Sequence, residues 1–129
     1  MEKVKILVVV EDEPDMREVI KLMLMADSRL EIMGEAESAE EAIALARTTD
    51  PGLIVLDHNI NGSIMGIQAA PLLKEVAPNA KILLFTAFDK AAEAEKEPAI
   101  DAYLRKDQLE KLVPTIDGML GLGPLEIRP

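Results

Sequence analysis

The sequence contains no cysteine and no tryptophan, and aromatic residues make up only 2% of its 129 positions. Without cysteine, disulfide bonds and thiol chemistry are excluded. With so few aromatic side chains the core must be aliphatic, and a flavin site, which relies on aromatic stacking, is disfavoured.

Long hydrophobic runs and an excess of basic residues are also missing. The apolar run Ile6–Val10 has the length of a strand, whereas a membrane-spanning helix needs about 18 residues. Charged residues interrupt this first apolar stretch, so we expect no signal peptide, no membrane insertion and a cytoplasmic location. The 24 acidic and 14 basic residues give a net charge of −10, which disfavours direct nucleic-acid binding.

What the chain does contain is a repeated alternation of buried strands and amphipathic helices. Short apolar runs are followed by segments whose apolar residues recur at helical spacing. This order predicts an α/β fold with a parallel sheet, specifically a flavodoxin-like doubly wound (βα)5 sheet with strand order 2-1-3-4-5. The five strands are expected at Val4–Val10, Leu30–Glu35, Leu53–Leu56, Lys81–Phe85 and Ile100–Leu104.

The length suits one domain, 1–129, with its core at about residues 4–120 and an irregular tail at 121–129. No effector domain fits in the remaining residues, so we expect a stand-alone unit.

Several residues mark helix ends. Ser38 with Glu41, and Asp107 with Glu110, have the spacing of capping boxes. Pro71 must lie near the first turn of its helix or mark a kink, and Pro114 is expected to kink the last helix.

Polar residues follow the predicted strands at the edge where such folds place their sites. Glu11 and Asp12 end the first strand, Asp57 the third and Thr86 the fourth, and Lys106 follows the fifth. Clustered carboxylates repel one another, and a hard divalent cation such as Mg²⁺ relieves that repulsion. A lysine and a hydroxyl nearby are suited to meet a phosphoryl group. Each residue alone is an ordinary surface, turn or strand residue, so the prediction depends on their joint occurrence.

Four motifs, in order and each at a predicted strand end, resemble the receiver domain of two-component response regulators. The resemblance covers roughly residues 4–120. The motifs are ILVVVEDEP at residues 6–14, IVLD at 54–57, LFTA at 84–87 and YLRKD at 103–107.

The resemblance implies a phosphorylation site with a bound Mg²⁺ ion. Asp57 resembles the phospho-acceptor, which attacks the phosphohistidine of a sensor histidine kinase or phosphotransfer protein and also binds the metal. Asp12 resembles a direct Mg²⁺ ligand, Glu11 one that acts through water, and Asn59 one that acts through its backbone carbonyl. The only histidine, His58, lacks a second ligand at suitable spacing, so we interpret it as a loop residue flanking the site.

The resemblance also implies a switch. Lys106 resembles the lysine that pairs with the phosphoryl oxygens, Thr86 the switch hydroxyl, and Tyr103 the aromatic residue that changes rotamer with it. Phosphorylation would then change binding to an unknown downstream protein or a homodimer, through the surface of helix 4, strand 5 and helix 5. Phe88 lies where side chains in this family influence water access, so its bulky ring predicts slow self-dephosphorylation.

The chain departs from the family pattern in the loop after Asp57. A proline is usual near position 61 and an aspartate before Gly66, but this chain has Asn61 and Met65, and the loop is one residue longer. A degenerate receiver that only binds proteins is therefore an alternative function. An aspartyl phosphohydrolase is a second alternative, but it needs a nucleophile on the first strand and a cap for which the chain is too short. We expect a signalling protein and not an enzyme.

Overall fold

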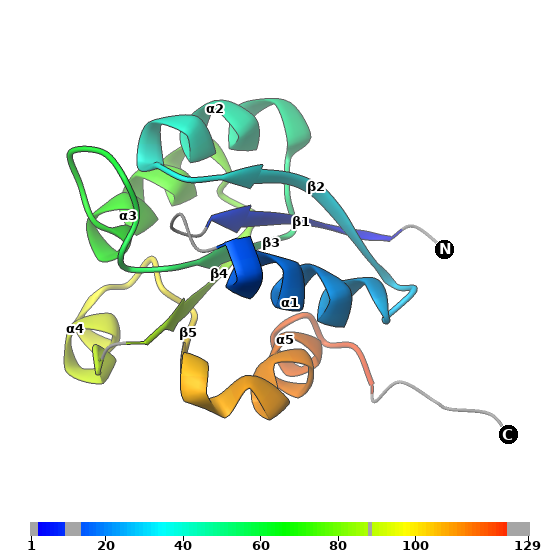
Figure 1. Cartoon of the computed structure of the whole chain (residues 1–129). Helices are drawn as coiled ribbons and strands as arrows, with labels where there is room; N and C mark the ends of the chain where they lie inside the picture. Colours follow the sequence, from blue (N-terminus) through cyan, green and yellow to red (C-terminus); the bar gives the residue numbers. More distant parts are fainter. Residues whose placement is uncertain (1–2, 10–13, 88, 124–129) are drawn as a thin grey trace, which may run out of the picture.

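The computed structural model describes residues 3–9, 14–87 and 89–123. It contains one five-stranded parallel sheet in the order β2-β1-β3-β4-β5, which confirms the predicted fold and strand order (Figure 1). The strands are β1 (Val4–Val9), β2 (Leu30–Ala36), β3 (Leu53–Leu56), β4 (Lys81–Thr86) and β5 (Ala102–Arg105).

Helices cover both faces of the sheet (Figure 1). One apolar cluster includes buried residues of α1 and α5, and the other includes those of α2, α3 and α4. The helices are α1 (Pro14–Met25), α2 (Ala39–Thr49), α3 (Gly66–Val76), α4 (Ala91–Lys96) and α5 (Leu112–Met119), and the 3-10 helix η1 (Lys106–Lys111) precedes α5. None of the helices in the described part of the chain is long and apolar enough to cross a membrane.

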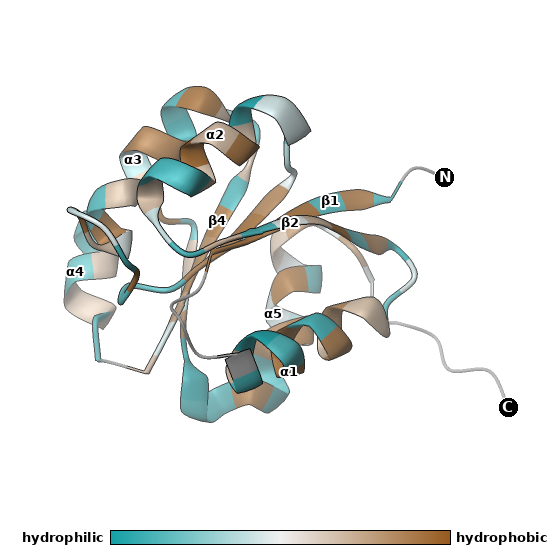
Figure 2. Cartoon of the chain, turned by 45° about the horizontal axis from the view of Figure 1, so that its top comes forward, coloured by the Kyte–Doolittle hydropathy of each residue, from teal (hydrophilic) through white to brown (hydrophobic). Residues whose placement is uncertain are grey.

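The three central strands β1, β3 and β4 are buried on both faces of the sheet, and successive side chains of each strand point to opposite faces. Ile6 and Val8 of β1 pack into the cluster on the α1 and α5 side, whereas Leu7 and Val9 pack into the other. Figure 2 shows the strands mostly in brown, the colour of hydrophobic residues. Burying each such side chain fully contributes roughly 2 kcal/mol, so this aliphatic sheet supplies the core that the missing aromatics do not.

The predicted helix signals have mixed outcomes. One half of the capping box predicted at Ser38 is confirmed, because Ser38 Oγ accepts a hydrogen bond from the backbone N–H of Glu41. The other half is wrong, because Glu41 Oε1 accepts from the backbone N–H of Glu37.

The prediction of a capping box at Asp107 is wrong, because η1 begins at Lys106. Its N-cap is Arg105, whose side chain makes no capping hydrogen bond. Asp107 Oδ2 accepts a hydrogen bond from Arg105 instead.

The two prolines have different outcomes. Pro71 is the sixth residue of α3 and therefore lies beyond the first turn, so the kink stays the prediction for this position. The kink predicted at Pro114 is wrong, because α5 begins at Leu112 and the proline lies in its first turn, where no helical N–H bond is lost. The backbone leaves helical geometry earlier, at Gln108, with φ −108° and ψ 41°. The predicted start of the fifth strand, Ile100, is two residues too early, because the N–H of Ile100 donates to the carbonyl of Glu97 in a turn and β5 begins at Ala102.

Candidate phosphorylation site

Asp57 directly follows β3, at the carboxyl edge of the sheet. Its backbone N–H donates a 2.8 Å hydrogen bond to the carbonyl of Val9, which holds it against β1. Its side chain is 2% exposed, so the carboxylate is almost fully removed from water. A buried carboxylate needs compensating partners, and the surrounding loops supply them.

Lys106 is the first of these partners. Its Nζ lies 2.6 Å from Asp57 Oδ2, and its side chain is 10% exposed. The pair joins the ends of β3 and β5 across β4, as the strand order predicts. Thr86, the last residue of β4, lies between these strands and is fully buried. The structure therefore brings Asp57 and Lys106 into contact, with Thr86 at the end of the intervening strand.

Asn59 is the second partner. Its backbone N–H donates a 3.2 Å hydrogen bond to Asp57 Oδ1, so the loop folds back over the carboxylate. Carboxylate and backbone carbonyl oxygens are the ligands that Mg²⁺ prefers, and Asp57 and Asn59 fit that donor set. The predicted metal ligands Glu11 and Asp12 and the predicted gating residue Phe88 lie outside the described residues. Among the described residues, no group of three carboxylate or histidine side chains gathers for a metal.

Tyr103 lies in β5, opposite Leu84 of β4. Because side chains alternate along a strand, Thr86 points to the same face as Leu84, and Tyr103 packs against the cluster that contains Leu84. The predicted switch pair therefore shares one face of the sheet.

The comparisons with known proteins agree with this geometry. The family model of the response regulator receiver domain matches residues 7–117. The chain belongs to the response regulator receiver family. A nitrate/nitrite response regulator protein homolog of Haemophilus influenzae is 32% identical over 108 residues, which are 82% of this chain and 51% of that protein. The uncharacterized transcriptional regulatory protein YxjL of Bacillus subtilis is 35% identical over 110 residues, again 82% of this chain and 50% of that protein.

This receiver thus spans about half the length of the curated relatives it matches. Among solved structures, the receiver domain of the putative response regulator NarL from Mycobacterium tuberculosis has 26% identity and a TM-score of 0.79, covering 94% of this chain and 99% of that one. The response regulator TrrA from Thermotoga maritima, solved in complex with Mg(2+)-BeF, has 32% identity and a TM-score of 0.72, covering 90% and 99%.

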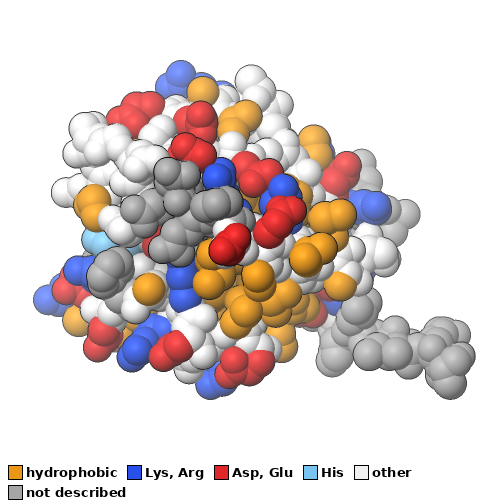
Figure 3. Space-filling view, viewed as in Figure 1, with side chains coloured by type: hydrophobic (Ala, Val, Ile, Leu, Met, Phe, Trp, Pro, Cys, Tyr) orange, Lys and Arg blue, Asp and Glu red, His pale blue; other side chains and the backbone are white. Residues whose placement is uncertain are grey.

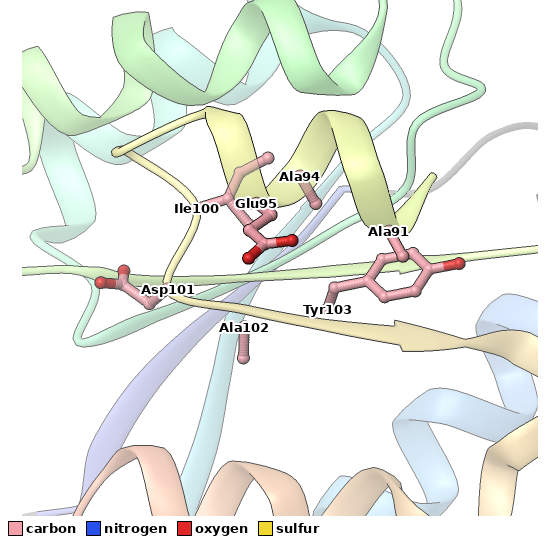
Figure 4. A pocket seen from close by; sticks show the side chains of 7 residues that line it. All are labelled: Ala91, Ala94, Glu95, Ile100, Asp101, Ala102 and Tyr103. Carbon is pink, nitrogen blue, oxygen red and sulfur yellow. The ribbon is translucent and has the colours of Figure 1, made fainter. Parts of the chain in front are cut away.

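Lys90 is a receiver residue that the sequence did not single out. It precedes α4, and its backbone N–H donates a 3.1 Å hydrogen bond to the hydroxyl oxygen of Tyr103. The tyrosine ring lies along α4 and lines a pocket of about 160 Å³ between α4 and β5 (Figure 4). The sequence carries little sign of the contact between Lys90 and Tyr103, because it uses a backbone N–H that every residue other than proline has.

His58 flanks the site, as its interpretation as a loop residue requires. Together with Asn59, Met65 and Lys90 it lines a pocket of about 210 Å³ beside the loop that follows Asp57. Its Nδ1 accepts a long, 3.4 Å hydrogen bond from the backbone N–H of Ile67. Burial, and next the positive charge of Lys90, lower the pKa of His58 below its ordinary value of 6.5.

We therefore expect His58 to be neutral at pH 7 and to titrate below pH 6.5. As the only histidine, it gives a single set of ring resonances, which a proton NMR titration can follow without assignment. Lys90→Gln should raise the pKa, whereas Lys96→Gln, on the other end of α4, should leave it unchanged. A depressed folded pKa means that the contribution of His58 to stability is present above its unfolded pKa and is lost as the pH falls through the folded pKa. An NMR midpoint above 6.5 in the folded wild type would contradict the prediction.

Proposed function

We propose that this receiver accepts a phosphoryl group on Asp57 from the phosphohistidine of a sensor histidine kinase or phosphotransfer protein. The observation that carries the proposal is the 2.6 Å contact between the buried carboxylate of Asp57 and Lys106 at the carboxyl edge of the sheet. Such a pair provides a nucleophilic carboxylate together with a cation that can bind the incoming phosphoryl oxygens. The solved complex of TrrA with Mg(2+)-BeF supports the same chemistry by analogy.

The transfer is a displacement at phosphorus. A carboxylate oxygen of Asp57 forms the new P–O bond while the P–N bond of the phosphohistidine breaks, and its electron pair stays on the imidazole. Lys106 neutralises charge on the phosphoryl group, first as the partner of the carboxylate and then as the partner of the phosphoryl oxygens. The backbone N–H of Asn59 holds the carboxylate in a fixed orientation, since it donates to Asp57 Oδ1.

Mg²⁺ would be held by Asp12, Asp57 and the backbone carbonyl of Asn59, with Glu11 acting through water. When bound, it supplies charge neutralisation for the incoming phosphoryl group. The metal also lessens repulsion between the carboxylates, which would otherwise favour protonation of one of them.

The phosphoryl group adds nearly two negative charges, and Thr86 and Tyr103 convert this local change into a new surface. The described residues offer two surfaces to protein partners. One is the pocket between α4 and β5, which Tyr103 lines (Figure 4). The other is the exposed apolar side of α1, with Val19, Leu22 and Met25, where hydrophobic side chains gather in Figure 3. No large exposed hydrophobic side chain of the described chain belongs to α4, β5 or α5, so a homodimer through that surface would depend on polar contacts and the pocket.

The proposal is tested by intact mass after incubation with acetyl phosphate, with and without Mg²⁺. We expect one added phosphoryl group that depends on Mg²⁺, is absent in Asp57→Asn and is formed at least about a hundredfold more slowly in Lys106→Met. Asp50→Asn makes the same chemical change in the turn before β3, at the other end of the strand, and should react like the wild type.

If the folded wild type gains no phosphoryl group under any of these conditions, the proposal is overturned. Such a result would favour the alternative, a receiver that binds protein partners independently of phosphorylation. Repeated turnover of a generic phosphate ester would favour an enzyme instead.

A further inference from the structure

The loop between β3 and α3, residues 57–65, lacks the proline that the family resemblance leads us to expect near position 61. Proline stiffens a loop by fixing its own φ angle and restricting the residue before it. Asn61 provides neither restriction. The structure shows a different restraint, which connects this loop to the turn between β2 and α2.

The first connection is made by the backbone. Asn61 and Ser38 form an isolated parallel β-bridge, and the N–H of Asn61 donates a 2.8 Å hydrogen bond to the carbonyl of Glu37. A proline at position 61 has no N–H and would exclude this bond. The bridge therefore lies near the place where the family pattern has a proline.

The second connection is made by side chains. Ser63 Oγ donates a 3.1 Å hydrogen bond to Glu40 Oε1, in the first turn of α2. Gly62, between the two connections, has φ +100°, and a Cβ at that position would lie 2.7 Å from Glu40 Oε2. Glycine thus both adopts the left-handed backbone and leaves room for the carboxylate. Hydrogen bonds from its own backbone N–H and then from Ser63 lower the pKa of Glu40, which keeps it an ionised acceptor.

The turn that receives these bonds is itself held on its other side. Arg17 of α1 donates a 3.0 Å hydrogen bond to Glu37 Oε1. The backbone N–H of Glu37 donates a 2.8 Å bond to Glu41 Oε1, which belongs to α2. The β3–α3 loop is therefore anchored to a turn that α1 and α2 already fix.

We propose that Glu37, Glu40, Asn61 and Ser63 form a clamp that positions Asn59 for Mg²⁺ binding. The inference rests on the proposed function, because it assigns Asn59 to the metal site. Asn59 lies between two restraints: its own N–H bonded to Asp57 Oδ1, and the N–H of Asn61 bonded to Glu37. Because both ends are held, the carbonyl of Asn59 keeps one orientation before the metal binds. The entropic cost of ordering the loop on metal binding is therefore small. The four clamp residues position the site and do not touch the reacting atoms.

The test compares two substitutions at one position, with Mn²⁺ as the probe cation. Asn61→Pro removes the N–H, whereas Asn61→Ala keeps the backbone bond and removes only the side chain. We expect Asn61→Pro to raise the dissociation constant for Mn²⁺, measured by electron paramagnetic resonance, by about tenfold, and Asn61→Ala to leave it within about twofold. Ser63→Ala should raise it by about threefold, and Ser63→Thr, which keeps the hydroxyl, should restore it. At saturating Mg²⁺ the phosphorylation rate of all four variants should stay within about twofold of the wild type, because the clamp acts on metal binding.

The outcomes separate this inference from the function on which it rests. If the wild type binds Mn²⁺ and neither Asn61→Pro nor Ser63→Ala weakens binding, the clamp is wrong and the proposed function stands. If the wild type binds no cation and gains no phosphoryl group, the proposed function fails and the clamp fails with it. Ser63 lies on the surface, so its variants keep the test decisive even if Asn61→Pro prevents folding.

Discussion

Gly66→Ala is expected to lower the free energy of unfolding by about 3 kcal/mol, although it adds a single methyl group. Gly66 is the first residue of α3, and its N–H donates a 2.7 Å hydrogen bond to the carbonyl of His58. A Cβ at this position would overlap the carbonyl oxygen of Asp57 and lie 2.7 Å from the Cα of His58. Both are backbone atoms, so no side-chain rotation relieves the contact, and the end of β3 or the start of α3 must shift.

Gly118→Ala is the matched control. Gly118 lies within α5, and apart from its chain neighbours and the backbone of its own helix a Cβ there would meet no described atom within 4 Å. Replacing a helical glycine by alanine in open space should stabilise the protein by up to about 1 kcal/mol. Urea unfolding of the two variants should therefore shift the midpoint in opposite directions. If Gly66→Ala loses less than about 1 kcal/mol, the close approach of α3 to Asp57 does not constrain the fold.

Gly66→Ala also links stability to the site. The atoms displaced by the new methyl group belong to Asp57 and His58, so the carboxylate moves relative to Lys106. We expect phosphorylation of the folded variant by acetyl phosphate to slow, because positioning provides much of the rate in phosphoryl transfer.

The sequence predicted the features of this receiver that depend on strand and helix periodicity. Alternating apolar patterns gave five parallel strands, and the rule for doubly wound sheets then gave their order. That order placed the ends of β3 and β5 near one another and so predicted that Asp57 and Lys106 meet. The N-cap at Ser38 was predictable because it depends on two residues three apart at the start of one helix.

The features that the sequence did not predict depend on backbone groups and on contacts between distant loops. The bond from the N–H of Lys90 to Tyr103 and the bridge from Asn61 to Ser38 use backbone groups, which leave no mark in the residue types. At Asp107 the capping-box spacing gave a wrong prediction, because the chain after β5 forms a 3-10 helix before α5 begins. The position of Arg29 between two aspartates, one of them 88 residues away, has no local pattern at all.

Arg29→Met is expected to lower the free energy of unfolding by about 3 kcal/mol at pH 7, because it leaves two buried carboxylates without their cation. Asp27 and Asp117 are 1% and 6% exposed. The guanidinium of Arg29 donates to Asp27 Oδ1 and Oδ2 at 2.9 and 2.8 Å, and to Asp117 Oδ2 at 3.2 Å. Its NH1 also donates to the carbonyl of Gly123, so the same side chain fixes the segment after α5. Arg47→Met, at an exposed position of α2, should change stability by less than about 0.5 kcal/mol.

The pH dependence distinguishes this cluster from ordinary surface ion pairs. The hydrogen bonds from Arg29 lower the pKa of Asp27, so its contribution to stability is present above its unfolded pKa and is lost as the pH falls through the folded one. Burial raises the pKa of Asp117, whose Oδ1 has no hydrogen-bond partner in the described structure. The contribution of Asp117 is therefore present below its unfolded pKa and is lost as the pH rises through the folded one.

In Arg29→Met both carboxyl groups lose the partner that favours their charged form, so both folded pKa values should rise. The destabilisation relative to wild type should then shrink as the pH is lowered towards about 4, where the buried groups can take up protons. Urea unfolding at pH 4.5, 6 and 7.5 (values chosen to bracket this range) measures the difference. A loss of stability in Arg29→Met that stays constant across these pH values would mean that the arginine acts by packing its side chain and not by compensating the two buried charges.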